Sequence, residues 1–242
     1  MPDTCPAGIW RQGLRAWASL THRLPSQCAV CHAWPAQRVC AACQAQFAPR
    51  LARCATCACT VPEGVTQCGE CLLHPPPLDA CLAALNYGFP WAQLLAQFKF
   101  HGDPGWANTL AGLMRQAPGA AAALNQADLV LPVPLSRERL RQRGYNQALL
   151  LARALGDAHV HPHLLLRTRD AEAQSHLTRA ERLRNLRGAF VLDPLAAPQV
   201  AGRHVLLVDD VMTTGATLHA AATPLREAGA AYVAALVLAR TP

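Results

Sequence analysis

The chain shows two kinds of hydrophobic pattern, and the change between them falls near residue 78. Beyond that point, continuous apolar runs of strand length alternate with segments of helical periodicity. Strands are predicted at 82–88, 128–133, 204–208 and 231–239, and helices at 91–98, 105–116, 136–155 and 217–228. Ser136 is a candidate N-cap for the third helix, and Gly229 closes the fourth. Because strands that are apolar throughout are typical of a buried parallel sheet, we predict an α/β domain with a mainly parallel sheet flanked by helices.

The first 78 residues have a different texture. Residues 6–22 place Trp10, Leu14 and Trp17 on one helical face, which predicts a short amphipathic helix that packs on a neighbouring domain. A membrane-surface anchor is the weaker alternative, because the helix has no basic run. From 28 to 71 there is almost no periodic apolar pattern, so an apolar core is not expected to hold that stretch. After a stiff spacer of three prolines, the predicted organisation is a helix in 1–25, a cysteine-rich module in 26–74 and the α/β domain in 79–242.

Composition narrows the class of protein. The 242 residues are 52% hydrophobic with a mean hydropathy of +0.10, which excludes wholesale disorder. No stretch approaches the roughly 18 consecutive apolar residues of a membrane-spanning helix. Arg11 and Arg15 interrupt the segment where a signal peptide needs an apolar core. The eleven cysteines are an odd number, which argues for reduced thiols rather than a disulfide framework. We therefore expect a cytoplasmic protein without a membrane span.

Eight cysteines form four Cys-x-x-Cys knuckles: Cys28 and Cys31, Cys40 and Cys43, Cys54 and Cys57, Cys68 and Cys71. The two-residue gap allows both thiolates of a knuckle to reach one tetrahedral ion at about 2.3 Å, and two knuckles complete a four-cysteine zinc site. Two structural zinc ions are predicted, without a catalytic role, because four thiolates leave no position for water. Metal binding would supply the folding free energy that the sparse apolar residues lack. Redox dithiols are the alternative, but four evenly spaced knuckles exceed what redox chemistry needs.

The knuckles can pair in two ways. Sequential pairing, first with second and third with fourth, is favoured over a crossed arrangement because it needs only short loops. Three cysteines remain, Cys5, Cys59 and Cys81, and burial as small side chains is their expected role. Cys59 is also placed to displace a neighbouring ligand, because it follows Cys57 by two residues.

The most informative segment runs from residue 204 to residue 219. An apolar strand leads into Asp209 and Asp210, and a loop of small residues then opens a helix: Met212, Thr213, Thr214, Gly215, Ala216 and Thr217. In a parallel sheet this loop lies at the carboxyl end of its strand, where ligands bind. Its backbone N–H groups, its hydroxyls and the helix dipole suit a phosphate, while the two acids need hydroxyls or a cation to face. A sugar phosphate meets both needs. An ordinary strand–turn–helix is the plain alternative, and the lack of Gly-Lys-Ser/Thr excludes a Walker-type nucleotide loop.

This segment resembles the phosphoribosyl pyrophosphate (PRPP) signature of type I phosphoribosyltransferases: four apolar residues, two acids and a Thr/Gly phosphate loop. The resemblance implies that Asp209 and Asp210 contact the ribose hydroxyls and that Met212 to Thr217 hold the 5′-phosphate. The stretches 131–152 and 168–190, the element 99–103 and the cysteine module together resemble the ComF family. In that family a double zinc ribbon precedes a phosphoribosyltransferase-like domain, and some members are linked to DNA uptake during natural competence.

Transfer from PRPP requires positive charge around the leaving pyrophosphate, usually including Mg²⁺. Arg143 is the first candidate for this contact, and Arg137 belongs to the loop that corresponds in position to the pyrophosphate loop of such folds. The resemblance also places Lys99 near the site. Asp209, Asp210 and Arg143 are therefore the expected catalytic residues.

Two nearby segments allow more than one interpretation. Tyr145 either faces the site or packs on the sheet. The arginine-rich stretch 167–187, which includes Gln174, Arg182 and Asn185, lies where these enzymes carry a lid, and a solvated basic helix is the alternative.

The net charge of +7 is by itself weak evidence that the protein binds nucleic acid. Of the 22 basic residues only Lys99 is a lysine, a skew that a GC-rich genome produces by itself. The distribution of charge is more informative. Segment 135–190 contains eleven arginines and five acids, and so carries six of the seven net positive charges.

Two functions are therefore predicted. The first is Mg²⁺-dependent phosphoribosyl transfer from PRPP to an unidentified acceptor. The second is a protein that handles single-stranded DNA, with competence proteins as partners, and uses the fold as a PRPP sensor or a basic platform.

Overall fold

The computed structural model describes residues 26–156, 158–168, 186 and 188–241. Its contacts divide the chain into two compact units, Met1–Gln46 and Phe47–Pro242. The helix predicted over 6–22 lies outside the described residues, as do Gln174, Arg182 and Asn185. The described part of the first unit has an antiparallel bridge between Ser26 and Ala36, followed by the start of α2 (Ala41–Phe47).

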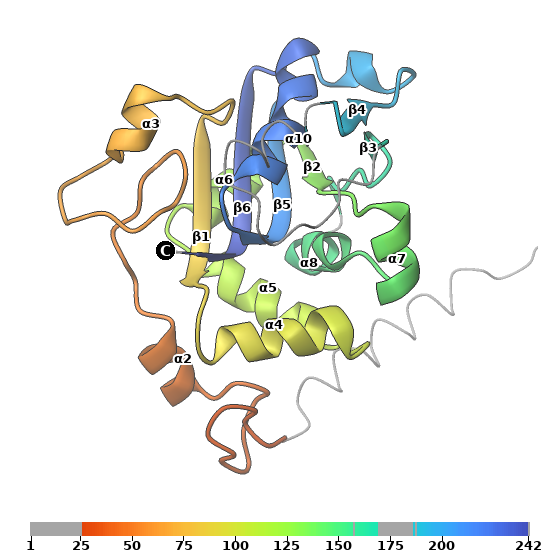
Figure 1. Ribbon diagram of the computed structural model, residues 1–242. Coiled ribbons are helices and arrows are strands. Elements are labelled where there is room, and N and C mark those ends of the chain that lie inside the picture. Colours follow the sequence, from red (N-terminus) through yellow and green to blue (C-terminus); the bar gives the residue numbers. More distant parts are fainter. Residues whose placement is uncertain (1–25, 157, 169–185, 187, 242) are drawn as a thin grey trace, which may run out of the picture. The chain divides into compact units, whose positions relative to one another are not determined.

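The second unit is built on a four-stranded sheet (Figure 1). Its strands are β1 (Ala80–Asn86), β2 (Leu129–Pro132), β5 (His204–Met212) and β6 (Tyr232–Arg240). Their order is β1-β6-β5-β2, and all three neighbouring pairs are parallel. The predicted parallel sheet is confirmed. β5 is longer than expected, so that Asp209 and Asp210 belong to the strand rather than to the loop after it.

Helices connect these strands, as the periodicity predicts. The described helices of this unit are α3 (Gly69–Leu73), α4 (Trp91–Phe100), α5 (Trp106–Arg115), α6 (Ala120–Gln126), α7 (Arg137–Arg143), α8 (Gln147–Leu155) and α10 (Ala216–Glu227), with a 3-10 turn at Ala197–Gln199. α6 was not predicted. Nor was the antiparallel hairpin of β3 (Leu165–Arg167) and β4 (Phe190–Leu192), whose strands are too short to show a period.

The single helix predicted over 136–155 is wrong, because it is two helices. Ser136 caps α7 as expected, its Oγ accepting from Arg139 N–H at 3.3 Å. Gly144 then takes a φ of +77°, which ends α7 in the left-handed conformation that glycine adopts without a Cβ clash. Asn146 starts α8 by accepting from the N–H groups of Ala148 and Leu149. Because of this break, α7 is a short separate helix, and none of its residues is buried.

The core shows how the sheet and the cysteine-rich segment meet. α5 and α8 contact the strands, and α10 packs over alternate strand residues such as Leu207 and Ala235. The same apolar cluster includes Cys54, Cys57 and Cys71. The prediction that no apolar core holds this part of the chain is therefore wrong for the third and fourth knuckles. The domain boundaries drawn from sequence, 26–74 and 79–242, remain a proposal about which parts fold independently.

Within the part of the chain that the structure describes, none of the helices has both the length and the apolar character required to cross a membrane.

Candidate functional site

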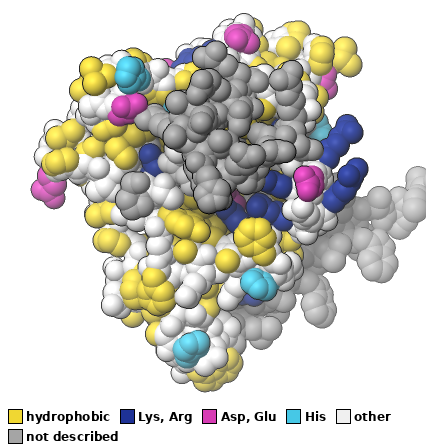
Figure 2. Space-filling view, in the orientation of Figure 1, with side chains coloured by type: hydrophobic (Ala, Val, Ile, Leu, Met, Phe, Trp, Pro, Cys, Tyr) yellow, Lys and Arg dark blue, Asp and Glu magenta, His cyan; other side chains and the backbone are white. Residues whose placement is uncertain are grey.

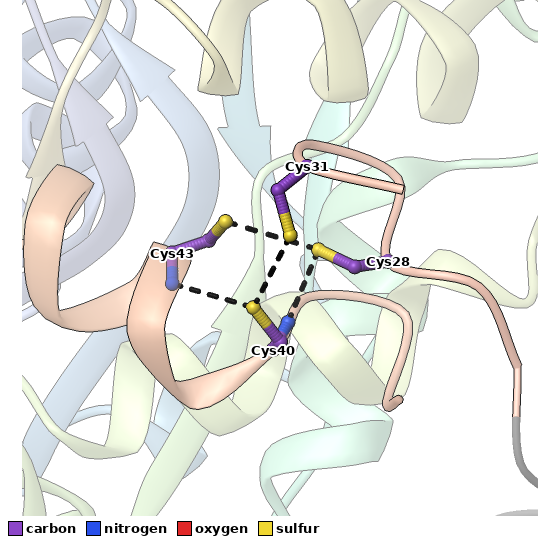
Figure 3. Close-up of side chains that lie close together, drawn as sticks. All are labelled: Cys28, Cys31, Cys40 and Cys43. Atoms are coloured by element: carbon purple, nitrogen blue, oxygen red, sulfur yellow. Dashed lines mark hydrogen bonds between the residues drawn. The ribbon is translucent and has the colours of Figure 1, made fainter. Parts of the chain in front are cut away.

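The first and second knuckles form one cluster of thiols. Figure 3 shows the four side chains directed toward one another, two from a turn and two from the start of α2. Cys28 Sγ lies 3.9 Å from Cys43 Sγ, and Cys31 Sγ lies 3.6 Å from Cys40 Sγ. A zinc ion with four Zn–S bonds of about 2.3 Å separates its sulfurs by about 3.8 Å. The thiol spacing therefore fits zinc, which supplies no reactive position when four thiolates bind it.

Backbone N–H groups support the charge of this cluster. Cys40 N–H donates to Cys28 Sγ at 3.3 Å, and Cys43 N–H donates to Cys40 Sγ at 3.5 Å. Burial opposes ionisation of Cys28, but backbone donors outweigh it and lower the pKa of this thiol to about 6. Burial and the neighbouring thiols raise the pKa of Cys43 to about 12. The backbone donors thus favour the thiolate form of Cys28, which is the form that binds a metal.

The third and fourth knuckles repeat this arrangement within the second unit. Cys68 N–H donates to Cys54 Sγ at 3.3 Å, the counterpart of the bond from Cys40 to Cys28. Cys57 Sγ and Cys68 Sγ are 3.6 Å apart. Burial opposes ionisation of Cys54, but its backbone donors lower the pKa to about 6. Both knuckle pairs are therefore sequential.

A fifth thiol enters this second cluster. The four mutually close sulfurs belong to Cys54, Cys57, Cys59 and Cys68, all within 4.8 Å of one another. Cys71 is the positional counterpart of Cys43, is 2% exposed, and lies within hydrogen-bonding reach of Cys57 and Cys68. Proximity thus favours Cys59 as the fourth ligand, and the internal repeat favours the predicted Cys71.

The predicted phosphate loop follows β5 and opens α10. Gly215 is the N-cap of α10 with a φ of +82°. A Cβ there would lie 2.6 Å from Met212 Cε and 2.9 Å from His219 Nε2, so only glycine fits. The first N–H groups of a helix have no intrahelical acceptor, and those of α10 carry the positive end of its dipole. Thr213 is exposed at this end, and Thr214 Oγ1 accepts from Ala216 N–H at 3.4 Å.

The side chain of Met212 is not part of that cradle. It is 2% exposed, and its sulfur accepts from the Cys81 thiol at 3.5 Å inside the core. Its Cε packs against Gly215, so the side chain supports the loop from within the core instead of facing a bound phosphate.

The two acids of β5 differ in their surroundings. Asp210 is 7% exposed and forms an ion pair with Lys99 of α4, 3.0 Å from Nζ to Oδ1. Asp209 Oδ1 accepts from Asp210 N–H at 2.8 Å. Burial, and then the charge of Asp210, raises the pKa of Asp209 to about 7, although the hydrogen bond from Asp210 N–H and the charges of Lys99 and Arg167 act to lower it. A carboxyl whose ionised form is disfavoured in this way, near the carboxyl end of a strand, is typical of a functional site.

Arg143, at the end of α7, lies close enough to the same acids to be influenced by their charge. Burial lowers its pKa, while the charges of Asp210 and Asp209 raise it, so the guanidinium lies in the field of both carboxylates. It donates to Gln147 Oε1 at 3.1 Å and sits 5.0 Å above the Phe100 ring. The structure thus brings together Asp209, Asp210, Lys99 and Arg143.

The other two nearby candidates are placed differently. Arg137 is exposed at the start of α7. The Tyr145 hydroxyl donates to the Phe98 carbonyl, and the two rings lie 5.9 Å apart. Tyr145 therefore packs on α4, and not on the sheet as the second of its two predicted roles had it.

Residues 165–242 match the family described as "Phosphoribosyl transferase domain". A "DNA utilization protein YhgH" of Salmonella typhimurium is 34% identical over 211 residues, covering 84% of this chain and 90% of its own. "Competence protein F" of Haemophilus influenzae is 33% identical over 208 residues, with the same coverage. "Competence protein ComFC" of Bacillus subtilis is 31% identical over 215 residues, covering 86% of each chain.

The chain belongs to the ComF family. The resemblance inferred from the stretches 131–152 and 168–190, the element 99–103 and the cysteine module is therefore confirmed, as is the phosphoribosyltransferase-like domain. Among solved structures, one described as the allosteric regulatory enzyme of purine biosynthesis aligns with 59% of this chain and 29% of its own length. Its identity of 23% and TM-score of 0.36 are too low to argue from.

Sequence reasoning missed two arginines beside the second cluster of this ComF-family chain. Arg53 donates to the Ala58 carbonyl at 3.0 Å, and Arg240 donates from Nε to the Cys57 carbonyl at 2.9 Å. Ala58 follows Cys57 with a φ of +56°, as His32 follows Cys31 with a φ of +60°. In a chain with 21 arginines, no local signal distinguishes these two.

Proposed function

We propose that this protein binds PRPP with Mg²⁺ and transfers its phosphoribosyl group to an acceptor that is not identified. One observation carries the proposal: Asp209 and Asp210 lie near the carboxyl end of β5, close to the N-terminus of α10. Lys99 pairs with Asp210, and Arg143 lies in the field of both acids. Two carboxylates beside an anion-binding helix N-terminus are unfavourable when no ligand is present. A sugar phosphate offers hydroxyl donors to the carboxylates and phosphate oxygens to the helix N–H groups. The family domain over 165–242 supports this function.

Each part of the site has a role in this reaction. Asp209 and Asp210 accept from the ribose hydroxyls, and the loop from Thr213 to Thr217 donates N–H groups to the 5′-phosphate. Lys99 and Arg143 face the pyrophosphate. The bond from ribose C1 to the pyrophosphate oxygen breaks, the pyrophosphate leaves with the bonding electrons, and a nucleophile of the acceptor bonds to C1 and loses its proton. Mg²⁺, when bound, neutralises charge on the pyrophosphate.

Isothermal titration calorimetry tests the proposal. Zinc-loaded protein is titrated with PRPP and Mg²⁺, beside the double variant Asp209→Asn/Asp210→Asn. We expect saturable binding by the wild type and a loss of at least about 100-fold in the variant, because both carboxylates that accept from the ribose hydroxyls lose their charge together. Wild-type protein that does not bind PRPP would refute the proposal.

A second candidate function is contact with single-stranded DNA. α7 presents Arg137 and Arg141 to solvent, and Figure 2 shows Lys and Arg side chains gathered on that side of the molecule. Phe100 is 68% exposed beside this helix. An aromatic ring next to a row of guanidiniums is the arrangement on which single-stranded bases stack. The relatives named for competence and DNA utilization favour this candidate as well.

Fluorescence anisotropy with a labelled oligonucleotide over a salt series tests this second candidate. We expect affinity to fall as salt rises, and Arg141→Gln to reduce the slope of log K against log salt by about 0.7, the value for one phosphate contact on a single strand. Phe100→Ala is expected to cost about 1–3 kcal/mol of binding. The control is Arg203→Gln, because Arg203 precedes β5 at the amino ends of the parallel strands, whereas α7 follows β2 at their carboxyl ends. Equal losses in the control and the α7 variant would contradict a surface on α7.

A further inference from the structure

The second cysteine cluster and the phosphate loop share one side chain. Arg240 is the last residue of β6 and pairs in register with Met212, the last residue of β5. Its Nε donates to the Cys57 carbonyl at 2.9 Å. Its Nη1 lies 3.3 Å from the Met212 carbonyl and also contacts the Thr213 carbonyl. One planar guanidinium therefore joins a metal knuckle to the first residue of the loop.

Charge gives a reason for this guanidinium to be here. Arg53 lies beside the same knuckle, donating to Ala58 and, at 2.9 Å, to Asn86 Oδ1. Arg53 and Arg240 therefore donate to the carbonyls of two consecutive residues, Ala58 and Cys57. Two guanidiniums side by side repel each other unless an anion compensates them. A zinc ion with four thiolates has a net charge of about −2, which matches the pair.

We propose that Arg240 is a positioning residue that couples metal occupancy of the second cluster to the affinity of the 213–217 loop for a sugar 5′-phosphate. This inference rests on the proposed function of that loop. With the metal in place, the Cys57 carbonyl is held where Arg240 can reach it and both loop carbonyls together. Without the metal, the knuckle and the compensating charge are lost, and the loop loses the donor that orders its first residue. The N–H groups that would cradle the phosphate are then no longer preorganised.

Linkage makes the proposal reciprocal. If the metal strengthens phosphate binding by some factor, phosphate binding must strengthen metal binding by the same factor. The coupling is therefore measurable from the metal side without any turnover.

The test compares Arg240→Gln and Arg240→Lys with the control Arg226→Gln. Arg226 also links its helix, α10, to a segment far away in the sequence, because it donates to the Pro77 carbonyl and contacts Asp79. It lies at the opposite end of α10 from the loop. Calorimetry with PRPP and Mg²⁺ is expected to show a loss of at least about 10-fold for Arg240→Gln. The control is expected to stay within about twofold of wild type. Arg240→Lys keeps the positive charge but lacks the several N–H donors of a guanidinium, so we expect its PRPP affinity to remain below that of wild type. It also provides a folded variant if the glutamine form does not fold.

Zinc release to a chromogenic chelator gives the second readout. In a background with the first cluster emptied by Cys31→Ser and Cys40→Ser, PRPP is expected to slow zinc release. Arg240→Gln is expected to abolish that effect. If Arg240→Gln lowers the melting temperature as Arg226→Gln does but leaves PRPP affinity and zinc protection unchanged, Arg240 is only structural and the inference is overturned.

The two proposals fail in different ways. If wild-type protein does not bind PRPP, the proposed function fails, and hydrogen exchange of the 213–217 amides then decides the coupling by itself. Zinc removal is expected to speed this exchange in wild type but not in Arg240→Gln, where the link is already broken. Exchange that does not respond to zinc in wild type overturns the inference.

Discussion

Replacing Cys28 and Cys43 together by serine is expected to leave residues 26–46 unfolded. In the described part of the first unit, the ordered structure is one antiparallel bridge and the start of α2, and few apolar side chains are buried. Structural zinc supplies about 10–16 kcal/mol of apparent binding free energy in peptides of this kind. No other interaction in this segment approaches that size. Hydrogen exchange over 26–46, with zinc measured by atomic emission, checks the result.

The second cluster is expected to behave differently. Cys54 and Cys57 belong to the apolar core beneath the sheet, so Cys54→Ser/Cys57→Ser should lower the melting temperature of the whole second unit. Single Cys59→Ser and Cys71→Ser variants identify the fourth ligand, because only one of them should release zinc from this cluster.

Two equivalents of zinc retained in Cys28→Ser/Cys43→Ser, with protected amides over 26–46, would contradict the first prediction.

Asp209→Asn is expected to stabilise the protein while it destroys PRPP binding. The Asp209 carboxyl has a pKa of about 7 when folded, against about 3.9 in an unfolded chain. Between these values the folded state binds more protons, so stability falls as pH rises from about 4 to about 7 and stays reduced above that. Asparagine removes the penalty but keeps an oxygen to accept from Asp210 N–H. At pH 8 we expect a gain of about 2–4 kcal/mol in unfolding free energy, from about 1.4 kcal/mol per pKa unit.

Urea denaturation at pH 8 and pH 5 measures this effect, and the gain should shrink at the lower pH. PRPP affinity should fall by about 100-fold at pH 8, because the amide no longer offers a charged acceptor to the ribose.

The matched control has the opposite sign. The N–H of His204, with Arg203, lowers the pKa of Asp128, so its ionised form stabilises the fold and this contribution is lost as pH falls. Asp128→Asn should therefore destabilise at pH 8 and leave PRPP affinity unchanged. If Asp209→Asn is less stable than wild type at pH 8, Asp209 is not a strained acid.

Local motifs explain why so much of the site could be predicted. The two cysteines of each knuckle are separated by two residues, and the segment from Val205 to Thr217 carries strand, acids and loop in one continuous run. Each of these spacings specifies a geometry by itself, since neighbouring residues have few ways to arrange their side chains. The prediction of one helix over 136–155 was wrong because it relied on the helical period of the whole stretch and ignored Gly144. The positive φ of this glycine ends the first of two helices.

Local sequence patterns are thus enough to predict the parallel α/β domain, the two cysteine clusters and the acid-and-loop segment at the end of β5. The ion pair of Lys99 with Asp210, the entry of Cys59 into the second cluster and the link from Cys57 through Arg240 to the loop depend on the folded chain. Lys99 and Asp210 are separated by more than a hundred residues along the chain, and so are Cys57 and Arg240. Such contacts exist because parallel strands bring their carboxyl ends to one edge, a fact of topology that no local spacing encodes.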